Sequence, residues 1–249
     1  MSWLHEPNGY QVLFNRDEKL TRARADGPRI AERNGVRFLA PVDGDHGGTW
    51  IAANQFGVTI CLLNGANITG TAADHPVRAP RSRGLLLLEL GAEKSAGAVS
   101  SRLSRMDLAA YSPFTLLAIE PNQPVLAEEW SGADYMTVAN ANELMPLISS
   151  SFDPAGVRQS RRQEFQRCHD LAGRVDAEML YSFHESHGRE PSAYSPCMHR
   201  ADARTVSFSW VKVSAREVDF FYSPDAPCQW KLGERTSLPR SEARAEARP

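Results

Sequence analysis

The stretch GYQVLFNRDE, residues 9–18, joins an apolar β-strand pattern directly to a cluster of polar residues. Its apolar part, Val12 to Phe14, is typical of a strand in a protein core. Four polar side chains follow without a break: Asn15, Arg16, Asp17 and Glu18. Two interpretations of this cluster are open: a structural ion pair that closes the strand end, or a polar site built where a sheet opens.

Turn residues and apolar patterns around this stretch predict more strands. A Pro-Asn-Gly turn at residues 7–9 joins two short apolar segments and indicates a β-hairpin. The stretch GGTWIAANQFGVTICLLNG, residues 47–65, holds two further strands. The second of these is apolar on both faces, so we expect it to be buried between two layers. Residues 16–44 are charged, and we expect them to be irregular apart from one strand. The strands predicted in this part are Ser2–His5, Tyr10–Asn15, Val36–Leu39, Thr49–Ala53 and Val58–Leu63.

The rest of the chain alternates helical and strand patterns. Apolar residues recur at helical spacing from Val99 to Ala110. The apolar pattern of Leu85–Leu90 fits either a helix or a strand. Its length and the following Gly91 favour a helix. Further helices are predicted at Pro154–Leu171 and Val175–His184. The later predicted strands are Phe114–Glu120, Pro124–Trp130, Tyr135–Val138, Thr205–Val213 and Glu217–Tyr222.

This order of elements predicts the fold class and the domain organisation. Strand blocks that alternate with helix pairs indicate an α+β fold. We expect a four-layer αββα sandwich, in which two stacked and mainly antiparallel sheets lie between outer helices. A single domain is expected over residues 1–232. Residues 233–249 are small and charged, with no apolar support beyond Leu238, and are expected to form a flexible tail.

Composition limits the classes of partner. The 249-residue chain has a net charge of −2, so it lacks the basic field that nucleic-acid binding requires. Its longest apolar runs are far shorter than a membrane span, and the N-terminus shows no secretory signal pattern. The four cysteines form no CxxC pair, which fits reduced thiols. We therefore expect a cytoplasmic protein with no nucleic-acid partner and no membrane span.

Several motifs resemble one known family. The segments FNRDE at residues 14–18, GGTW at 47–50 and LLNG at 62–65 look like the NRDE family, the family of transport and Golgi organisation protein 2. RSRG at 81–84 and DARTVSFSWVKV at 202–213 extend the resemblance to about Tyr222. The resemblance implies a fold similar to N-terminal-nucleophile hydrolases, in particular penicillin V acylases and bile-salt hydrolases.

The resemblance also implies roles for individual residues. In those hydrolases an N-terminal Cys attacks an amide, and its own α-amino group is the base. Arg16 and Asp17 match the residues that hold the nucleophile, and Asn64 matches the residue that donates to the oxyanion. This chemistry is sound, because a guanidinium lowers a thiol pKa and an amide N–H stabilises developing negative charge. The remaining expected ligand-binding residues are Asn15, Glu18, Gly47, Gly48, Trp50 and Arg83.

The start of the chain departs from the family pattern. The family begins Met-Cys, whereas this chain begins Met1-Ser2-Trp3. A serine exposed by removal of Met1 could be a nucleophile, but bacterial relatives carry their Cys about three residues upstream of Ser2. Three residues of strand span about 10 Å and reverse the face. We therefore expect Ser2 to point away from Arg16 and Asp17, and the nucleophilic Cys to be missing from this chain start.

Simpler interpretations of the same residues remain. Asn64-Gly65 is also a turn signal, and Trp50 is also typical of an apolar core. The Gly47-Gly48 pair can allow two backbone segments to approach each other closely. Two metal-ligand patterns are weak: His184-Glu-Ser-His187 lacks zincin spacing, and Cys197-Met-His199 has no second pair in the sequence. No metal site and no cofactor are predicted.

Two functions are consistent with the sequence. The first is hydrolysis of an amide or related acyl C–N bond. The second is non-catalytic binding and trafficking of haem or of a lipid-like acyl ligand in the same pocket. Histidine or methionine could supply a haem ligand, although no CxxCH motif is present.

Overall fold

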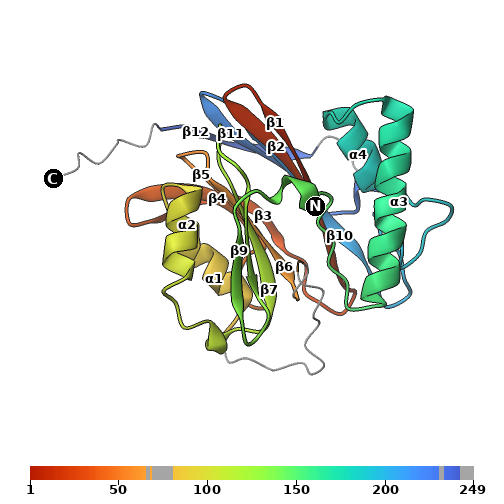
Figure 1. Ribbon diagram of the computed structural model, residues 1–249, viewed down its shortest axis with the longest axis horizontal. Helices are drawn as coiled ribbons and strands as arrows, with labels where there is room; N and C mark the ends of the chain where they lie inside the picture. Colours follow the sequence, from red (N-terminus) through yellow and green to blue (C-terminus); the bar gives the residue numbers. More distant parts are fainter. Residues whose placement is uncertain (66–67, 69–80, 230–232, 242–249) are drawn as a thin grey trace.

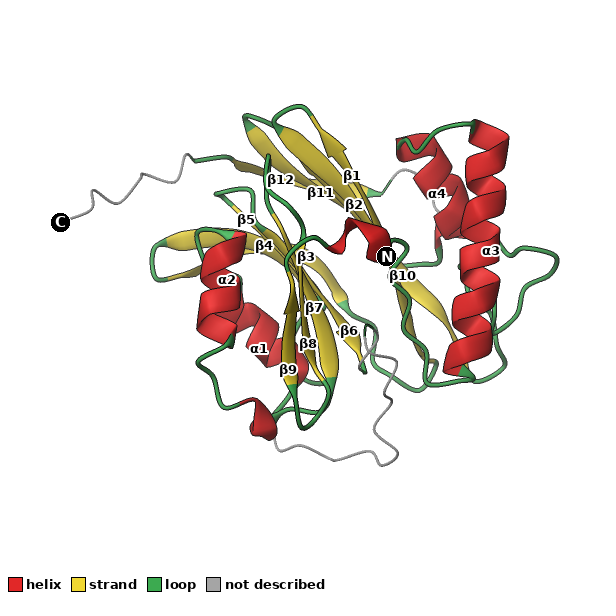
Figure 2. Ribbon diagram, in the orientation of Figure 1, coloured by secondary structure: helices red, strands yellow, loops and turns green. Residues whose placement is uncertain are grey.

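The computed structural model describes residues 1–65, 68, 81–229 and 233–241, and it contains two β-sheets between two pairs of helices (Figure 1). One sheet has five strands in the order β1-β2-β10-β11-β12, and the other has seven in the order β3-β4-β5-β6-β7-β8-β9. Neighbouring strands within each sheet are antiparallel. Figure 2 shows the helices on the outer sides of the sheets. The predicted four-layer αββα fold is confirmed.

The five-stranded sheet is built on the N-terminal hairpin. Its strands β1 and β2 pair with Ser2 opposite Leu13, and the turn between them has Asn8 in the left-handed region, with φ of 60°. Along β2 the side chains alternate, so that Phe14 faces the other sheet while Leu13 faces the helices. The strands are β1 (Ser2–Glu6), β2 (Gly9–Lys19), β10 (Ala203–Val213), β11 (Glu217–Ser223) and β12 (Glu234–Pro239).

The seven-stranded sheet has the expected buried strand at its centre. Strand β6 lies between β5 and β7, and its residues from Thr59 to Leu63 are all buried. The prediction of a central strand covered on both faces is therefore confirmed. The strands are β3 (Asp26–Arg33), β4 (Val36–Val42), β5 (Ile51–Asn54), β6 (Thr59–Asn64), β7 (Phe114–Ile119), β8 (Leu126–Trp130) and β9 (Tyr135–Val138).

The helices begin and end at the residues that local signals favour. Asp153 caps α3 with Pro154 in its first turn, and Gly173, with φ of 71°, ends it. Asp176 caps α4 in the same way. None of the helices in the described part of the chain is long and apolar enough to cross a membrane. The helices are α1 (Arg83–Leu90), α2 (Ala96–Leu103), α3 (Pro154–Ala172), α4 (Ala177–Glu185) and the 3-10 turns η1 (Leu108–Ala110), η2 (Ala141–Leu144) and η3 (Pro227–Gln229).

Three apolar cores hold the layers together. The first lies between the two sheets and contains Trp3 and Phe14 from one sheet with Ile51 and Leu63 from the other. The second lies under α1 and α2 against the seven-stranded sheet. The third lies under α3 and α4 and includes Leu13. Each sheet is therefore buried on both faces, as its apolar strands require.

Three local predictions are wrong. Residues 16–44 are not irregular, because β2 continues to Lys19 and an edge strand forms at Asp26–Arg33. Edge strands are mostly exposed, so this one carries charged residues and little apolar pattern. The tail expected at 233–249 is wrong for Glu234–Pro239, which pairs with β11 and buries Leu238. The helix expected up to residue 110 ends at Leu103 and is followed by a 3-10 turn.

Candidate functional site

A cavity of about 650 Å³ opens where the two sheets meet the helices. Its size is within the range of small-molecule sites. Strand β2, the end of β6, the start of α1 and the helices α3 and α4 all contribute to its wall. The predicted residues that line it are Asn15, Arg16, Asp17, Glu18, Gly48, Trp50, Asn64 and Arg83. Two others, Ser2 and Gly47, are not among the lining residues.

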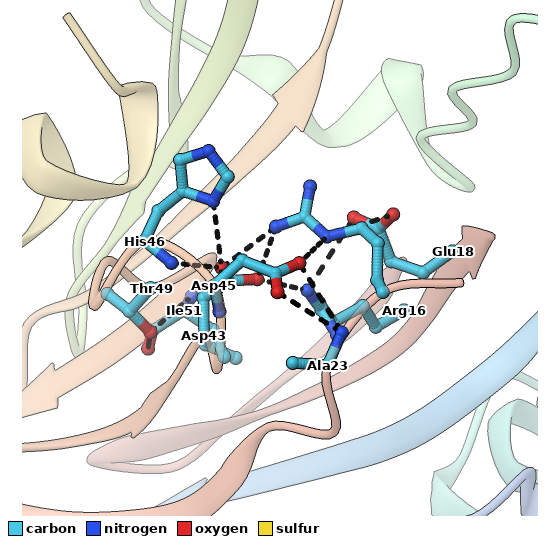
Figure 3. A network of polar contacts seen from close by, with 9 residues as sticks. Arg16, Glu18, Ala23, Asp43, Asp45, His46, Thr49 and Ile51 are labelled. Carbon is cyan, nitrogen blue, oxygen red and sulfur yellow. Dashed lines mark hydrogen bonds and ion pairs between the residues drawn. The ribbon is translucent and has the colours of Figure 1, made fainter. Parts of the chain in front are cut away.

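Arg16 lies on the face of β2 that meets the second sheet. Only 7% of its side chain is exposed, and its guanidinium lies 4.3 Å from the centre of the Trp50 ring. Its Nη2 donates to Asp43 Oδ2 at 2.5 Å and lies 3.6 Å from Glu18 Oε1 (Figure 3). Burial lowers the pKa of Arg16, and the two carboxylates oppose that shift. The guanidinium remains charged. The expected pairing of Arg16 with a carboxylate is present.

Asp43 is the centre of this polar network (Figure 3). It accepts hydrogen bonds from Arg16 and Arg22 and from the backbone N–H groups of Asp45 and His46. Burial alone raises the pKa of Asp43, but Arg22, the His46 N–H and Arg16 together hold it below its usual value. Asp43 is therefore a carboxylate that fixes the position of Arg16 in the cavity wall.

Asn15 and Asp17 lie on the opposite face of β2, toward α3 and α4. Asn15 Nδ2 donates to the carbonyl oxygens of His184 and Pro196, both at 2.9 Å. Asp17 Oδ2 accepts from Arg161 at 3.0 Å, and Asp17 Oδ1 accepts from Thr205 Oγ1 at 2.6 Å. Because side chains alternate along a strand, the tetrapeptide NRDE is divided between two layers of the fold.

Ser2 lies in a buried chain of hydrogen bonds. Its Oγ is 2.9 Å from His184 Nε2, and His184 Nδ1 is 2.9 Å from Asn15 Oδ1. Because that oxygen only accepts, His184 Nδ1 carries the proton. Burial, and then the N-terminal charge and Arg161, hold the pKa of His184 well below its usual value. The neutral ring therefore accepts a hydrogen bond from the Ser2 hydroxyl.

This order of serine, histidine and asparagine is that of a nucleophile, a base and an orienting residue. However, Ser2 is 0% exposed and does not line the cavity. The prediction that Ser2 points away from Arg16 agrees with the structure. The prediction that it points away from Asp17 is wrong, because Asp17 shares the helix-facing side of the sheet with Ser2.

The α-amino group of Met1 lies at the cavity. It donates to the Leu147 carbonyl oxygen at 2.8 Å. Burial, together with the positive charge of Arg161, lowers its pKa to about 5. At neutral pH the group is therefore an uncharged amine, which is the protonation state that a base requires.

Asn64, Arg83 and Gly48 contribute another part of the cavity wall. Asn64 ends β6, and Arg83 begins α1 with its Nη1 donating to the Pro113 carbonyl oxygen at 2.7 Å. Burial lowers the pKa of Arg83. Gly48 lies against Gly84, so closely that a Cβ on Gly48 would be 2.7 Å from the Gly84 carbonyl carbon. Gly47 instead supplies a left-handed turn, with φ of 65°.

A protein-family model matches most of the chain. The model described as Transport and Golgi organisation 2 matches residues 2–173, which include the NRDE and GGTW motifs. The chain belongs to this family. The last three strands, β10 to β12, lie outside the residues matched by the Transport and Golgi organisation 2 model. The comparison with curated proteins gives no match.

Solved structures similar to this family member include proteins with the N-terminal-nucleophile hydrolase fold. Penicillin V acylase from Agrobacterium tumefaciens is 11% identical with a TM-score of 0.53, over 90% of this chain and 81% of that one. The Caenorhabditis elegans ortholog of N-acylethanolamine-hydrolyzing acid amidase is 14% identical with a TM-score of 0.55, over 84% and 91%. A conjugated bile acid hydrolase variant from Clostridium perfringens is 10% identical with a TM-score of 0.52, over 99% and 98%. At such identities the likeness shows a shared fold.

Three residues of the site in this Transport and Golgi organisation 2 family member were not predicted. Asp43 holds Arg16, Arg161 holds Asp17, and His184 holds Ser2 and Asn15. Asp43 precedes the GGTW motif by a few residues, which is a weak signal. Arg161 and His184 lie 144 and 169 residues from their β2 partners, so no local pattern indicates them.

Proposed function

We propose that the cavity binds a small acyl compound and is the site of C–N bond hydrolysis when a cysteine precedes Ser2 by three residues. The register of β1 against β2 carries this proposal. Ser2 lies opposite Leu13 and Trp3 lies opposite Val12. If the same antiparallel pairing is continued backwards, the residue three positions before Ser2 lies opposite Arg16.

The alternation of side chains supports the same geometry. Met1 and Phe14 belong to the core between the sheets, whereas Ser2 and Leu13 face the helices. A residue two positions before Met1 shares the face of Met1 and of Arg16. Its side chain would therefore enter the cavity wall beside the Arg16 guanidinium. Ser2, three residues later, has the opposite orientation.

The proposed reaction uses groups that already line the cavity. The neighbouring guanidinium of Arg16 favours the thiolate of the cysteine, which attacks the amide carbonyl carbon. The amide N–H₂ of Asn64 donates to the developing oxyanion. The cysteine's own α-amino group takes the thiol proton and gives it to the leaving amine. Water then cleaves the resulting thioester and releases the acid.

The ligand class follows from the two kinds of side chain in the cavity wall. The apolar part can accept an acyl chain, and it consists of Met1, Phe14, Leu62, Leu63, Leu147 and Ile148. The polar part, around Arg16 and Arg83, suits a carbonyl or carboxylate group. The names of the structural neighbours, an acylase, an acid amidase and a bile acid hydrolase, support an amphipathic acyl amide.

The test compares four proteins on a panel of acyl amides. They are the chain that begins at Met1, a variant whose mature N-terminus is Cys three residues before Ser2, the same extension beginning with Ala, and the Cys extension with Arg16→Ala. We expect turnover by the Cys-extended variant alone, because the other three lack either the thiol or the group that activates it. Turnover by the Met1 chain that Ser2→Ala abolishes would overturn the proposal. Equal rates for the Cys and Ala extensions would also overturn it.

Non-catalytic binding is the second candidate, and the apolar wall favours it, because an acyl chain can bind there without any chemistry. Calorimetric titration of a fatty acid and absorbance titration of haem into the Cys and Ala extensions distinguish the two functions. Equal binding to both without hydrolysis by either indicates a carrier for acyl ligands or haem.

A further inference from the structure

A second cluster of reactive side chains lies beyond the cavity, where the loop between α4 and β10 meets η3. Its members are His187, Cys197, His199 and Cys228, and one ligand atom from each lies within 4.8 Å of the other three. They come from two segments: His187, Cys197 and His199 from the loop between α4 and β10, and Cys228 from the turn η3. The sequence shows no second pair beside Cys197 and His199, but the fold brings His187 and Cys228 next to them.

The distances within the cluster have the size that a tetrahedral metal site requires. His199 Nε2 lies 3.6 Å from Cys197 Sγ and 3.6 Å from Cys228 Sγ. Zn–S bonds of about 2.3 Å and Zn–N bonds of about 2.05 Å at tetrahedral angles separate S and N by about 3.6 Å. One imidazole nitrogen has a single lone pair and cannot accept from both thiols, so the two contacts require either an N–H shared between the sulfurs or a metal ion between all three atoms.

His187 gives an independent observation. Its Nε2 is buried, and no hydrogen-bond partner for it exists in the part of the chain that the structure describes. The His187 ring lies edge-on to the His199 ring, with 4.9 Å between ring centres. A buried imidazole nitrogen without a partner costs free energy. A metal ion bound between the two rings and the two sulfurs would satisfy it.

We infer that these four residues bind one zinc ion as a closed structural site. Two thiolates and two imidazoles are the soft and borderline donors that zinc prefers, whereas magnesium and calcium prefer oxygen. Four protein ligands leave no open position for water or substrate, so the ion has a structural role. The four cysteines are free in this structure, which leaves both sulfurs of the cluster available as ligands.

The position of the ion would connect it to the cavity. Pro196, which precedes Cys197, accepts a hydrogen bond from Asn15. Met198 N donates to Thr205 Oγ1, which in turn donates to Asp17. The segment that carries two of the ligands therefore also holds Asn15 and Asp17. Zinc would fix this wall of the cavity by joining it to α4 and η3.

The test measures zinc in the full-length chain. Protein loaded with Zn²⁺ and dialysed is analysed by elemental mass spectrometry, and affinity is measured by competition with a chromophoric chelator. We expect one zinc per chain, and a loss of affinity of about 100-fold or more in Cys228→Ser and in His187→Gln. Cys168→Ser and His169→Gln are the controls, since these residues lie on α3 and should leave zinc binding unchanged.

Cobalt substitution gives a second readout that does not depend on a variant. Co²⁺ in the unaltered chain should show thiolate charge-transfer absorption and the strong visible bands of tetrahedral coordination. Cys228→Ser should lose about half of the charge-transfer intensity, because it removes one of two thiolates. Failure of the unaltered chain to retain zinc would overturn the inference. Retention that is the same in the ligand variants, or a Cys197–Cys228 disulfide in the freshly purified protein, would also overturn it.

Discussion

Replacement of Asp43 by asparagine tests the polar network that holds Arg16. The substitution keeps the size of the side chain and one acceptor oxygen but removes the charge between Arg16 and Arg22. Loss of one partner from a buried pair costs about 3–5 kcal/mol. Glu18, at 3.6 Å from Arg16, still offers a carboxylate, and 32% of the Arg22 side chain is exposed. We therefore expect Asp43→Asn to lower the free energy of unfolding by about 2–3 kcal/mol at pH 7.

The pH dependence of this loss has a definite sign. The folded-state pKa of Asp43 is below that of the unfolded chain. The stabilisation is therefore complete above the unfolded value, at about pH 4, and is lost as pH falls through the folded value. Because protonation removes the same charge from the unaltered protein, the difference between the two proteins should shrink in acid.

Urea unfolding at neutral and acidic pH measures both effects. Asp45→Asn is the matched control, because 34% of the Asp45 side chain is exposed and its ion pair with Arg22 should contribute less than about 1 kcal/mol. A loss for Asp43→Asn no larger than that of the control, or a loss that is independent of pH, would refute the reasoning.

Three other changes give further tests. Ser2→Ala should lower the free energy of unfolding by about 1–3 kcal/mol, because it leaves buried His184 Nε2 without a partner; acyl-ligand affinity measured by calorimetry should not change. Gly48→Ala should destabilise by about 1–3 kcal/mol and weaken ligand binding, since its Cβ would be 2.7 Å from the Gly84 backbone; unaltered thermal unfolding would contradict this contact. The Met1 amine has a pKa of about 5 when folded and about 8 when unfolded, so the chain should gain stability as pH rises between these values. N-terminal acetylation should flatten that dependence, and a parallel profile for the acetylated protein would show that another group is responsible.

The fold could be predicted wherever burial leaves a periodic pattern. Strand β6 was predicted because two layers cover it, which makes it apolar on both faces. The edge strand β9 was also predicted, with the bounds Tyr135–Val138 that the structure has. The edge strands β3 and β12 were missed. Both have largely polar sequences and are held by backbone hydrogen bonds to one neighbour, and these bonds leave no mark on side-chain composition. Leu238 alone indicated that β12 has a buried face.

The site could be predicted in part, because a contiguous motif marks one of its walls. Arg16, Asp17 and Asn64 line one cavity, as expected, although their roles in a reaction stay predictions. Arg161 and His184 could not be found, since the chain brings them to β2 only through the packing of α3 and α4. The metal-ligand cluster was missed for the same reason, because its four residues span the chain from 187 to 228. Spacing identifies such sites only when the ligands lie close together in the sequence.

The division of NRDE between two faces of β2 has a consequence for how this motif can vary. The four adjacent residues form two independent pairs. Asn15 and Asp17 contact the helical layer, whereas Arg16 and Glu18 face the other sheet. Arg16 depends on Asp43 in the neighbouring sheet, whereas Asn15 and Asp17 depend on His184 and Arg161 in the helices. Among relatives, a change at Arg16 should be accompanied by a change at Asp43, and a change at Asp17 by one at Arg161. A protein that rebuilt its outer helices could lose half of the tetrapeptide and keep the other half intact.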